Sequence, residues 1–317
     1  MSAPVLVVVE HDRGAIPDDA RQGLAFAREL VPDAPVAAVV IGGETPPEIA
    51  GADTVWHVRH AELSDYAPEA WGDALHQLAE HVQPAAIVAS GTERGNEVLA
   101  HVAALADQPF AANVVQATPG SPWTLRRIRW GGSLLEDATL ESRLPILSAA
   151  LHQFEAPTAG EPTPVTDFTP ELRPDAARTR IVDRVQVAEG ITLTTAPVVV
   201  SGGRGVGSEE GFAALEALAE LLGAAVGCSR VVTNQGWRPH ADQVGQTGKR
   251  VAPELYVACG ISGAIQHWVG MQAAKHVLAI NTDRDAPMVT KADYAVIGDL
   301  HEVVPAIVDE LKKRASR

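Results

Sequence analysis

The chain has 317 residues, a formal net charge of −15, 46% hydrophobic residues, 27 glycines and five phenylalanines. This length suits two ordinary domains, and a composition rich in alanine and valine suits sheets that are buried on both faces. Because nucleic-acid binding requires a basic face, the acidic balance excludes that class of function.

In the first half, short valine-rich runs alternate with segments whose apolar residues recur at helical spacing. This alternation predicts a parallel sheet with helices on both faces. The predicted strands are residues 5–9, 36–41, 55–58 and 85–89, and the predicted helices are residues 18–30, 68–82 and 96–106.

The pattern changes after residue 110. Residues 113–117, 125–130 and 146–154 resemble strands, yet no helical pattern of ordinary length separates them. We therefore expect an antiparallel extension on one edge of the sheet. Residues 156–177 are rich in proline, which breaks helices and strands, and so predict a surface excursion. Residues 180–187 alternate again and predict a return to the first sheet.

One loop of this half has the residues of a ligand site. The segment SGTERGNEV, residues 90–98, places a glycine, a hydroxyl and charged groups after a predicted strand, where ligands bind in such folds. The alternative is helix capping, in which Thr92 and Asn96 satisfy free backbone groups.

The second half begins with a strand, a glycine-rich loop and a helix, an arrangement that can bind phosphate. These elements are residues 196–200, 201–208 and 209–222, and a further strand follows at 224–228. The dinucleotide fingerprint is incomplete, because Gly203 and Gly205 are followed by Ser208 where a third glycine belongs. The next strand leads to Ser229 and Arg230, without an acid to hold a ribose hydroxyl. Ordinary nicotinamide binding is therefore disfavoured.

Residues 243–283 contain a second candidate for a phosphate site. Two glycine-rich turns bracket a predicted strand, and the second turn opens onto a predicted helix and a further strand. These three elements are residues 255–259, 264–275 and 276–280. Gly260, Ser262 and Gly263 would let backbone amides approach an anion at the start of the helix.

Polar side chains from both turns could reach the same ligand. Gln266 and His267 follow the second turn, and Thr247 lies in the first. A P-loop is excluded, because Gln243 stands where its first glycine belongs and Arg250 stands where serine or threonine should bind magnesium. The pattern therefore predicts a phosphate-bearing cofactor with a polar ring.

Several strings, taken in order, resemble the cofactor half of the electron-transfer flavoprotein alpha subunit family. They are SGGRG, VGQTGK, APELY, GISGAIQH, AIN and ADYAVIGDL. In the first half the likeness is best at residues 91–99. The resemblance implies an α/β protein with two Rossmann-like domains. Residues 1–189 would form an N-terminal domain at the subunit interface, with a mostly parallel sheet and an antiparallel extension. Residues 190–317 would form a C-terminal FAD-binding domain with a parallel sheet.

The resemblance also implies which residues bind FAD. Arg204 and Arg230 would lie near the isoalloxazine ring, Thr247 toward flavin N5 and His267 toward O2. Phosphate, ribose and adenosine contacts are implied for Ser229, Ser262, Asn281, Asp299 and Leu300. The remaining implied contacts come from the two turns: Gln243, Val244, Gly245, Gln246, Gly260, Gly263, Ala264, Ile265 and Gln266.

This arrangement has a chemical consequence. Adding one electron to a flavin without a proton puts negative charge around N1 and O2, where two guanidinium groups and a protonated imidazole would stabilise it. We predict a red, not a blue, flavin after one-electron reduction.

Each assignment has a structural alternative. Arg204 and Arg230 could be solvated charges, and His267 could be a histidine of the core. Asn281 could serve turn geometry, and Asp299 could cap the helix predicted at residues 303–311.

The function that the resemblance implies is electron carriage by a heterodimer. FAD would take electrons from flavin dehydrogenases and pass them to a membrane-bound quinone oxidoreductase. The beta subunit would be the partner, with one FAD per heterodimer and AMP or a second flavin in that subunit. The alternatives are a self-contained flavin-dependent oxidoreductase, an electron-bifurcating variant and a colourless nucleotide sensor. No grouping of nucleophile, base and orienting residue is visible, which favours a carrier over an enzyme.

The cysteines and the hydropathy indicate where the protein works. Cys228 and Cys259 lie at the ends of apolar runs without metal-site spacing, so we expect buried, reduced thiols. No apolar run approaches the length of a membrane span, and the first predicted strand leaves no room for a targeting segment. We therefore expect a soluble, cytoplasmic protein without membrane insertion.

Overall fold

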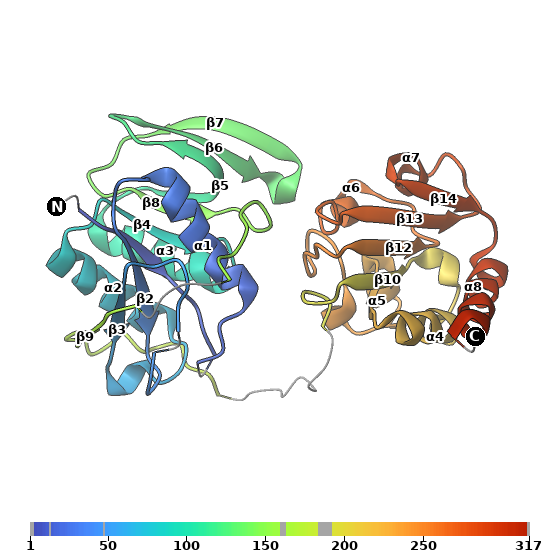
Figure 1. The fold of residues 1–317 in the computed structure, drawn as a ribbon, viewed down its shortest axis with the longest axis horizontal. Coiled ribbons are helices and arrows are strands. Elements are labelled where there is room, and N and C mark those ends of the chain that lie inside the picture. The colour runs from blue at the N-terminus through green and yellow to red at the C-terminus, as the bar shows by residue number, and fades with distance from the viewer. Residues whose placement is uncertain (1–2, 13, 47, 159–162, 183–191, 316–317) are drawn as a thin grey trace. The chain divides into compact units, whose positions relative to one another are not determined.

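The computed structural model describes residues 3–12, 14–46, 48–158, 163–182 and 192–315. The chain forms two compact units, each built on its own sheet (Figure 1). The first unit contains the described strands and α-helices up to residue 168, and the second contains those from residue 198 onward.

The sheet of the first unit has nine strands within the described residues, in the order β7-β6-β5-β8-β4-β1-β2-β3-β9. Their bounds are β1 Val5–Val8, β2 Val36–Ile41, β3 Thr54–Val58, β4 Ala86–Ser90, β5 Phe110–Thr118, β6 Trp123–Arg129, β7 Leu134–Leu140, β8 Ile146–Ala149 and β9 Val165–Phe168. All neighbours from β5 to β9 in this order are parallel, whereas β6 pairs antiparallel with β5 and with β7. The mostly parallel sheet and its antiparallel edge are therefore confirmed.

Helices cover both faces of this sheet, as predicted. They are α1 Asp18–Leu30, α2 Pro68–Val82 and α3 Glu93–Ala106 (Figure 1). Val5 and Val7 of β1 pack with Phe26 of α1, and the alternate residue Leu6 packs with Leu75 of α2. Both faces of a parallel sheet are thus buried, which explains the continuous apolar runs.

Three predictions for the first sheet were wrong in detail. Strand β7 was not predicted, β8 ends at Ala149 instead of residue 154, and β9 lies inside the proline-rich excursion. Of the predicted strand at 180–187, residues 183–187 lie outside the described residues, and residues 180–182 form no strand. The edge strand β9 tolerates neighbouring prolines because only one of its sides pairs, with β3.

The loop after β4 supports the capping alternative. Thr92 Oγ1 accepts a hydrogen bond from the Gly95 amide at 2.9 Å and caps α3. Asn96 Nδ2 donates to the Gly91 carbonyl at 3.1 Å. The side-chain carboxyl group of Glu10 also accepts from the Thr92 hydroxyl, so an acidic side chain of the protein already lies at the start of α3.

The second unit has a parallel sheet with five strands in the described chain, in the order β11-β10-β12-β13-β14. The strands are β10 Val198–Gly202, β11 Ala225–Cys228, β12 Leu255–Cys259, β13 His276–Asn281 and β14 Tyr294–Ile297. The helices are α4 Phe212–Leu222, α5 Arg230–Asn234, α6 Ile265–Trp268, α7 Pro287–Lys291 and α8 Leu300–Ala315. Helices α4 and α8 lie together on one face of the sheet (Figure 1). Strand β11 is added on one side of β10, and β12 to β14 are added on the other side, so the strand order reverses between β10 and β12. Ligands of open α/β sheets bind beyond the carboxyl ends of the strands at such a point.

The predicted helix at 264–275 was wrong, because α6 ends at Trp268. Beyond α6 the chain turns, and Met271 is fully buried in the core of this unit. The start of α6 contacts the first glycine-rich turn, where the Gln246 amide donates to the Gln266 carbonyl at 2.7 Å. Tertiary contacts at both ends therefore override the helical spacing of the sequence.

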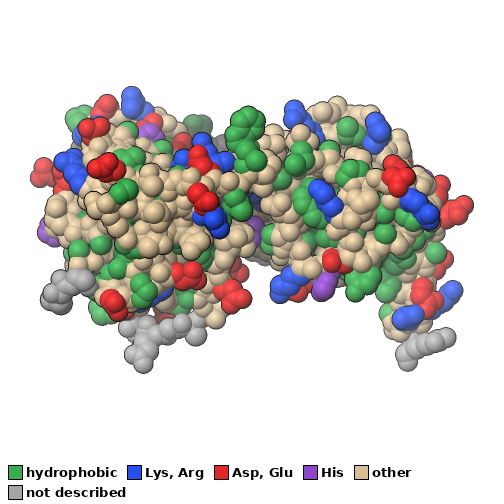
Figure 2. Space-filling view, turned by 90° about the horizontal axis from the view of Figure 1, so that it is seen from above, with side chains coloured by type: hydrophobic (Ala, Val, Ile, Leu, Met, Phe, Trp, Pro, Cys, Tyr) green, Lys and Arg blue, Asp and Glu red, His purple; other side chains and the backbone are tan. Residues whose placement is uncertain are grey.

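The surface carries charges of both signs (Figure 2), and the two thiols are buried, as the sequence predicts for them. Acidic and basic side chains are interspersed over the face seen in Figure 2. Cys228 and Cys259 are buried free thiols, and burial raises the pKa of each to about 12. Among the described helices, none combines the length and the apolar character needed to cross a bilayer.

Candidate functional site

The carboxyl edge of the second sheet collects most of the predicted site residues. Arg204 follows β10, and Ser229 and Arg230 follow β11. The second glycine-rich turn, residues 260–264, follows β12, and Asn281 ends β13. Because these strands are parallel, their carboxyl ends lie at one edge of the sheet.

Backbone hydrogen bonds hold the loops of this edge together. The Gly203 amide donates to the Cys259 carbonyl at 2.9 Å, and the Gly205 amide donates to the Gly260 carbonyl at 3.1 Å. A Cβ on Gly203 would lie 2.3 Å from the Gly260 oxygen, so only glycine allows this approach. The glycines of the two loops therefore serve loop packing, and they bring the backbone of both loops to the edge.

The first glycine-rich turn, residues 243–249, divides into buried and exposed residues. Gln243 is only 2% exposed, and its amide donates to Thr247 Oγ1 at 2.9 Å while its carbonyl accepts from Thr233 at 2.7 Å. Val244 and Gly245 are buried as well, whereas Gln246 and Thr247 are exposed. The side chain of Gln243 thus holds Thr247 in place instead of facing outward.

The second turn presents an open surface. Ser262, Ala264, Ile265 and Gln266 are exposed, and Ile265 is 53% exposed although it is a large apolar residue. No described side chain caps the start of α6. Gly263 is buried with φ of 80°, and it packs against the start of α7. A planar apolar ring and a polar tail would both find partners on this turn.

Two positive charges at this edge lack acidic partners. Arg204 and Arg230 are exposed, and neither forms an ion pair or a side-chain hydrogen bond with any residue that the structure describes. By contrast, Arg238 of the same unit pairs with Glu216 and Asp242. In a chain of charge −15, two unneutralised guanidinium groups at one edge favour an anionic ligand.

His267 is buried, with 6% of its surface exposed. Its Nε2 lies 2.9 Å from the hydroxyl oxygen of Tyr256, and its Nδ1 has no hydrogen-bond partner within the described chain. Burial lowers the pKa of His267 to about 4, against a smaller opposing effect of the Val244 backbone. The imidazole is therefore neutral at pH 7, which contradicts the protonated form considered from the sequence.

The predicted adenosine end makes local contacts. Asp299 Oδ1 accepts from the His301 amide at 2.9 Å and so caps α8, and Leu300 is only 4% exposed. Asn281 Oδ1 accepts from the Asp283 amide at 3.1 Å, as in a turn. The capping and turn alternatives both hold, and ligand contacts of these residues stay predictions.

Sequence reasoning missed Tyr256. The signal was available, since a tyrosine inside an apolar strand needs a partner for its hydroxyl. The strand reads Leu255–Cys259, and Tyr256 is its one polar-tipped side chain.

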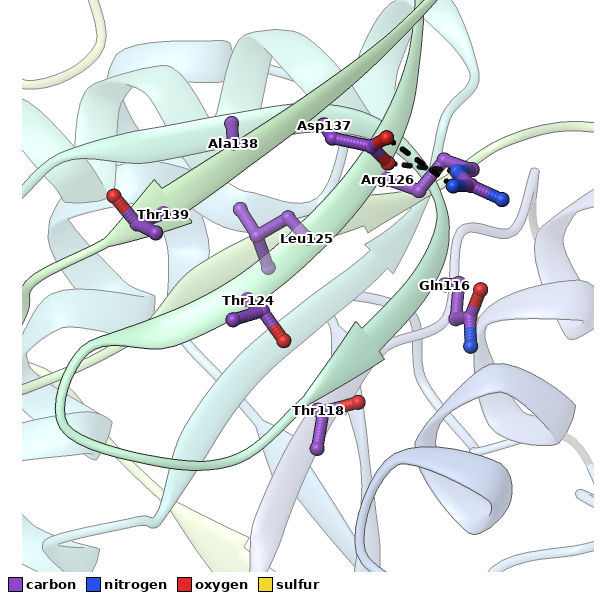
Figure 3. Close-up of a pocket in the computed structure, with 8 residues that line it drawn as sticks. All are labelled: Gln116, Thr118, Thr124, Leu125, Arg126, Asp137, Ala138 and Thr139. Atoms are coloured by element: carbon purple, nitrogen blue, oxygen red, sulfur yellow. Dashed lines mark hydrogen bonds and ion pairs between the residues drawn. The ribbon is translucent and has the colours of Figure 1, made fainter.

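The first unit contains several hollows, among them the following two. One, about 560 Å³, runs over the antiparallel strands, where Arg126 and Asp137 form a double hydrogen bond on its rim (Figure 3). The other, about 940 Å³, lies at the carboxyl ends of β1, β2, β3 and β9, and His11 in its wall is bonded through both ring nitrogens. Because these groups already satisfy one another, neither hollow matches the open donors of the second unit.

The packing of Gly263 gives a test of this edge. An alanine Cβ there would lie 2.3 Å from the Met288 backbone nitrogen, and the residue has φ of 80°. We expect Gly263→Ala to lower the free energy of unfolding by about 2–4 kcal/mol, measured by chemical denaturation. Gly223→Ala is the matched control, because Gly223 has φ of 59° but open space around it, and should cost about 1 kcal/mol. Equal losses in the two variants would contradict the close packing.

Comparison with known proteins gives the family. Residues 5–201 match the Electron transfer flavoprotein domain, and residues 192–272 match the Electron transfer flavoprotein FAD-binding domain. The electron transfer flavoprotein subunit alpha of Mycobacterium leprae is 37% identical, over 98% of this chain and 99% of the relative. Proteins of this kind from Bradyrhizobium diazoefficiens and from mitochondria of Oryza sativa are 35% identical, over 97% and 98% of this chain and 98% and 89% of the relatives. The chain therefore belongs to the electron transfer flavoprotein alpha subunit family.

Proposed function

We propose that this chain is the FAD-carrying alpha subunit of a heterodimeric electron carrier. The observation that carries the proposal is the edge where Arg204 and Arg230 stand without acidic partners and His267 keeps a ring nitrogen open. The family's FAD-binding domain supports FAD as the cofactor. The carrier would accept electrons from flavin dehydrogenases and deliver them to a membrane-bound quinone oxidoreductase.

The domain division is part of the proposal. Residues 1–189 would form the Rossmann-like N-terminal domain at the subunit interface, and residues 190–317 the Rossmann-like FAD-binding domain. The boundary itself lies outside the described residues. The name "subunit alpha" of the relatives supports a beta subunit as partner. One FAD per heterodimer, with AMP or a second flavin in the beta subunit, completes the proposed assembly.

The exposed groups of the edge fit a flavin dinucleotide. Arg204, Arg230 and Thr247 would face the ring, and Ile265 offers apolar surface beside them. Ser229 and Ser262 would meet the phosphates and ribose, together with the amides of the second turn. When bound, FAD supplies the one-electron chemistry that side chains lack.

The side chains tune this cofactor by charge and by hydrogen bonding. Unpaired guanidinium groups stabilise negative charge on a reduced ring, because no acidic partner offsets them. His267 is neutral, so it contributes a hydrogen bond instead of a charge. A residue with so low a pKa is also a poor general base at neutral pH, which supports a carrier over a substrate-converting enzyme.

Co-purification tests the proposal. The chain is expressed with the product of the neighbouring reading frame, and FAD and AMP are counted per heterodimer. We expect a yellow pair of polypeptides with one FAD, which accepts electrons from a flavin dehydrogenase and turns over no small substrate alone. A colourless pair, or steady turnover by the isolated chain, would contradict it.

A further inference from the structure

A buried contact below the site joins β12 to α6. Tyr256 has no exposed surface, and its hydroxyl oxygen lies 2.9 Å from His267 Nε2. The two rings meet edge to face, with centroids 6.1 Å apart and planes at 61°. This contact occupies one ring nitrogen of His267 and leaves Nδ1 without a partner among the described residues.

Both groups are neutral, so the contact holds a single proton between them. Burial raises the pKa of Tyr256, against a smaller opposing effect of Ser201, and burial lowers the pKa of His267 to about 4. A neutral imidazole has one N–H donor and one acceptor nitrogen. Either the phenol donates to Nε2 and the imidazole proton sits on Nδ1, or Nε2–H donates to the phenol.

The hydrogen-bond partners available to the buried phenol and imidazole distinguish these two forms. Ser201 lies on the same face of the sheet as Tyr256. The Ser201 hydroxyl has no partner in hydrogen-bond geometry in the described part of the chain. If Nε2–H donated to Tyr256, the buried phenol proton would have no acceptor in hydrogen-bond geometry among the described residues, and a buried unmade hydrogen bond is costly. If the phenol donates, its proton is satisfied and His267 carries an N–H on Nδ1.

We propose that Tyr256 is a positioning residue that fixes neutral His267 in the tautomer with its proton on Nδ1. This nitrogen then offers a hydrogen-bond donor to an acceptor atom on the pyrimidine edge of the flavin, a step that rests on the proposed function. A neutral donor strengthens as negative charge develops on its acceptor and has no excess proton to release. The contact with Tyr256 also fixes the orientation of the His267 ring. In functional histidines generally, a hydrogen bond to one ring nitrogen sets the state of the other.

The test combines the tautomer and the potential. Nitrogen NMR of the FAD-loaded heterodimer, labelled at histidine, should show Nδ1 protonated and Nε2 unprotonated for His267. Tyr256→Phe removes only the hydroxyl and should release the second tautomer. It should also make the first one-electron reduction about two- to tenfold less favourable, which is about 20–60 mV.

Tyr294→Phe is the matched control, because Tyr294 lies in the same unit on β14 and is 64% exposed. It should change neither the tautomer nor the potential. A proton on Nε2 in the unsubstituted protein would overturn the proposal without any variant, even if Tyr256→Phe failed to fold. An unchanged tautomer and potential in Tyr256→Phe would overturn it as well. A heterodimer without FAD would instead defeat the proposed function, while the tautomer of His267 in that protein would still report on Tyr256.

Discussion

Arg230→Ala should lower the midpoint potential of the first electron by about 65–130 mV. A contact between a charged donor and an anionic acceptor contributes about 1.5–3 kcal/mol, and about 59 mV corresponds to each factor of ten for one electron. Arg230 has the right character for such a contact, because it begins α5 at the carboxyl edge without an acidic partner in the described chain. Spectroelectrochemical titration of the FAD-loaded heterodimer would measure the shift.

The control variant removes an arginine that lies away from the carboxyl edge. Arg314 lies in the last turn of α8, which begins at the carboxyl edge and runs 16 residues, about 24 Å, toward the opposite edge. Arg314→Ala should therefore leave the potential unchanged. If Arg230→Ala kept FAD and its potential, Arg230 would be a solvated charge, which was the alternative considered from the sequence. Arg204→Ala should resemble Arg230→Ala, because Arg204 also lacks an acidic partner among the described residues.

The first sheet shows how far periodicity leads. The strand at residues 36–41 and the helices at 18–30 and 68–82 were predicted to the residue, because each carries a continuous apolar run or an apolar stripe. Strand β7 was missed because its strand character depends on its partner. Glu136 and Asp137 of β7 pair with Arg127 and Arg126 of β6, and that cross-strand complementarity is invisible in either segment alone.

In the candidate site, local sequence patterns predict where residues lie but not how burial changes them. Local motifs placed Arg204, Arg230 and the second turn correctly after parallel strands, so the edge could be inferred from the sequence. The charge state of His267 could not, because its low pKa comes from burial by residues distant in the chain. The hydrogen bonds of the Gln243 side-chain amide group with Thr247 and Thr233 could not be predicted either, and a ligand contact of Gln243 stays a prediction. Spacing predicts which residues meet, whereas burial decides what each can still offer.

Phe212→Ala should destabilise the second unit without destabilising the first. Phe212 is 1% exposed at the start of α4 and packs on Gly202, where a Cβ would lie 2.5 Å from its ring. Gly202 ends β10 just before the Arg204 loop, so the cavity would loosen the carboxyl edge as well as the core. Removing a buried phenylalanine costs about 3–5 kcal/mol, which for a unit of this size lowers the melting temperature by about 10–20 °C. Flavin fluorescence on release, followed during heating of the heterodimer, would report the second unit.

Phe26→Ala gives the matched change in the first unit. Phe26 is 2% exposed and packs against Phe154 with ring centroids 5.0 Å apart, so its loss creates a cavity of the same kind. If residues 190–317 hold FAD as a domain with its own core, flavin release should shift strongly in Phe212→Ala and little in Phe26→Ala. Circular dichroism should show a loss of stability in both variants. Equal shifts of flavin release would instead mean that the two cores unfold together, because cooperative unfolding spreads a local loss over the whole folding unit.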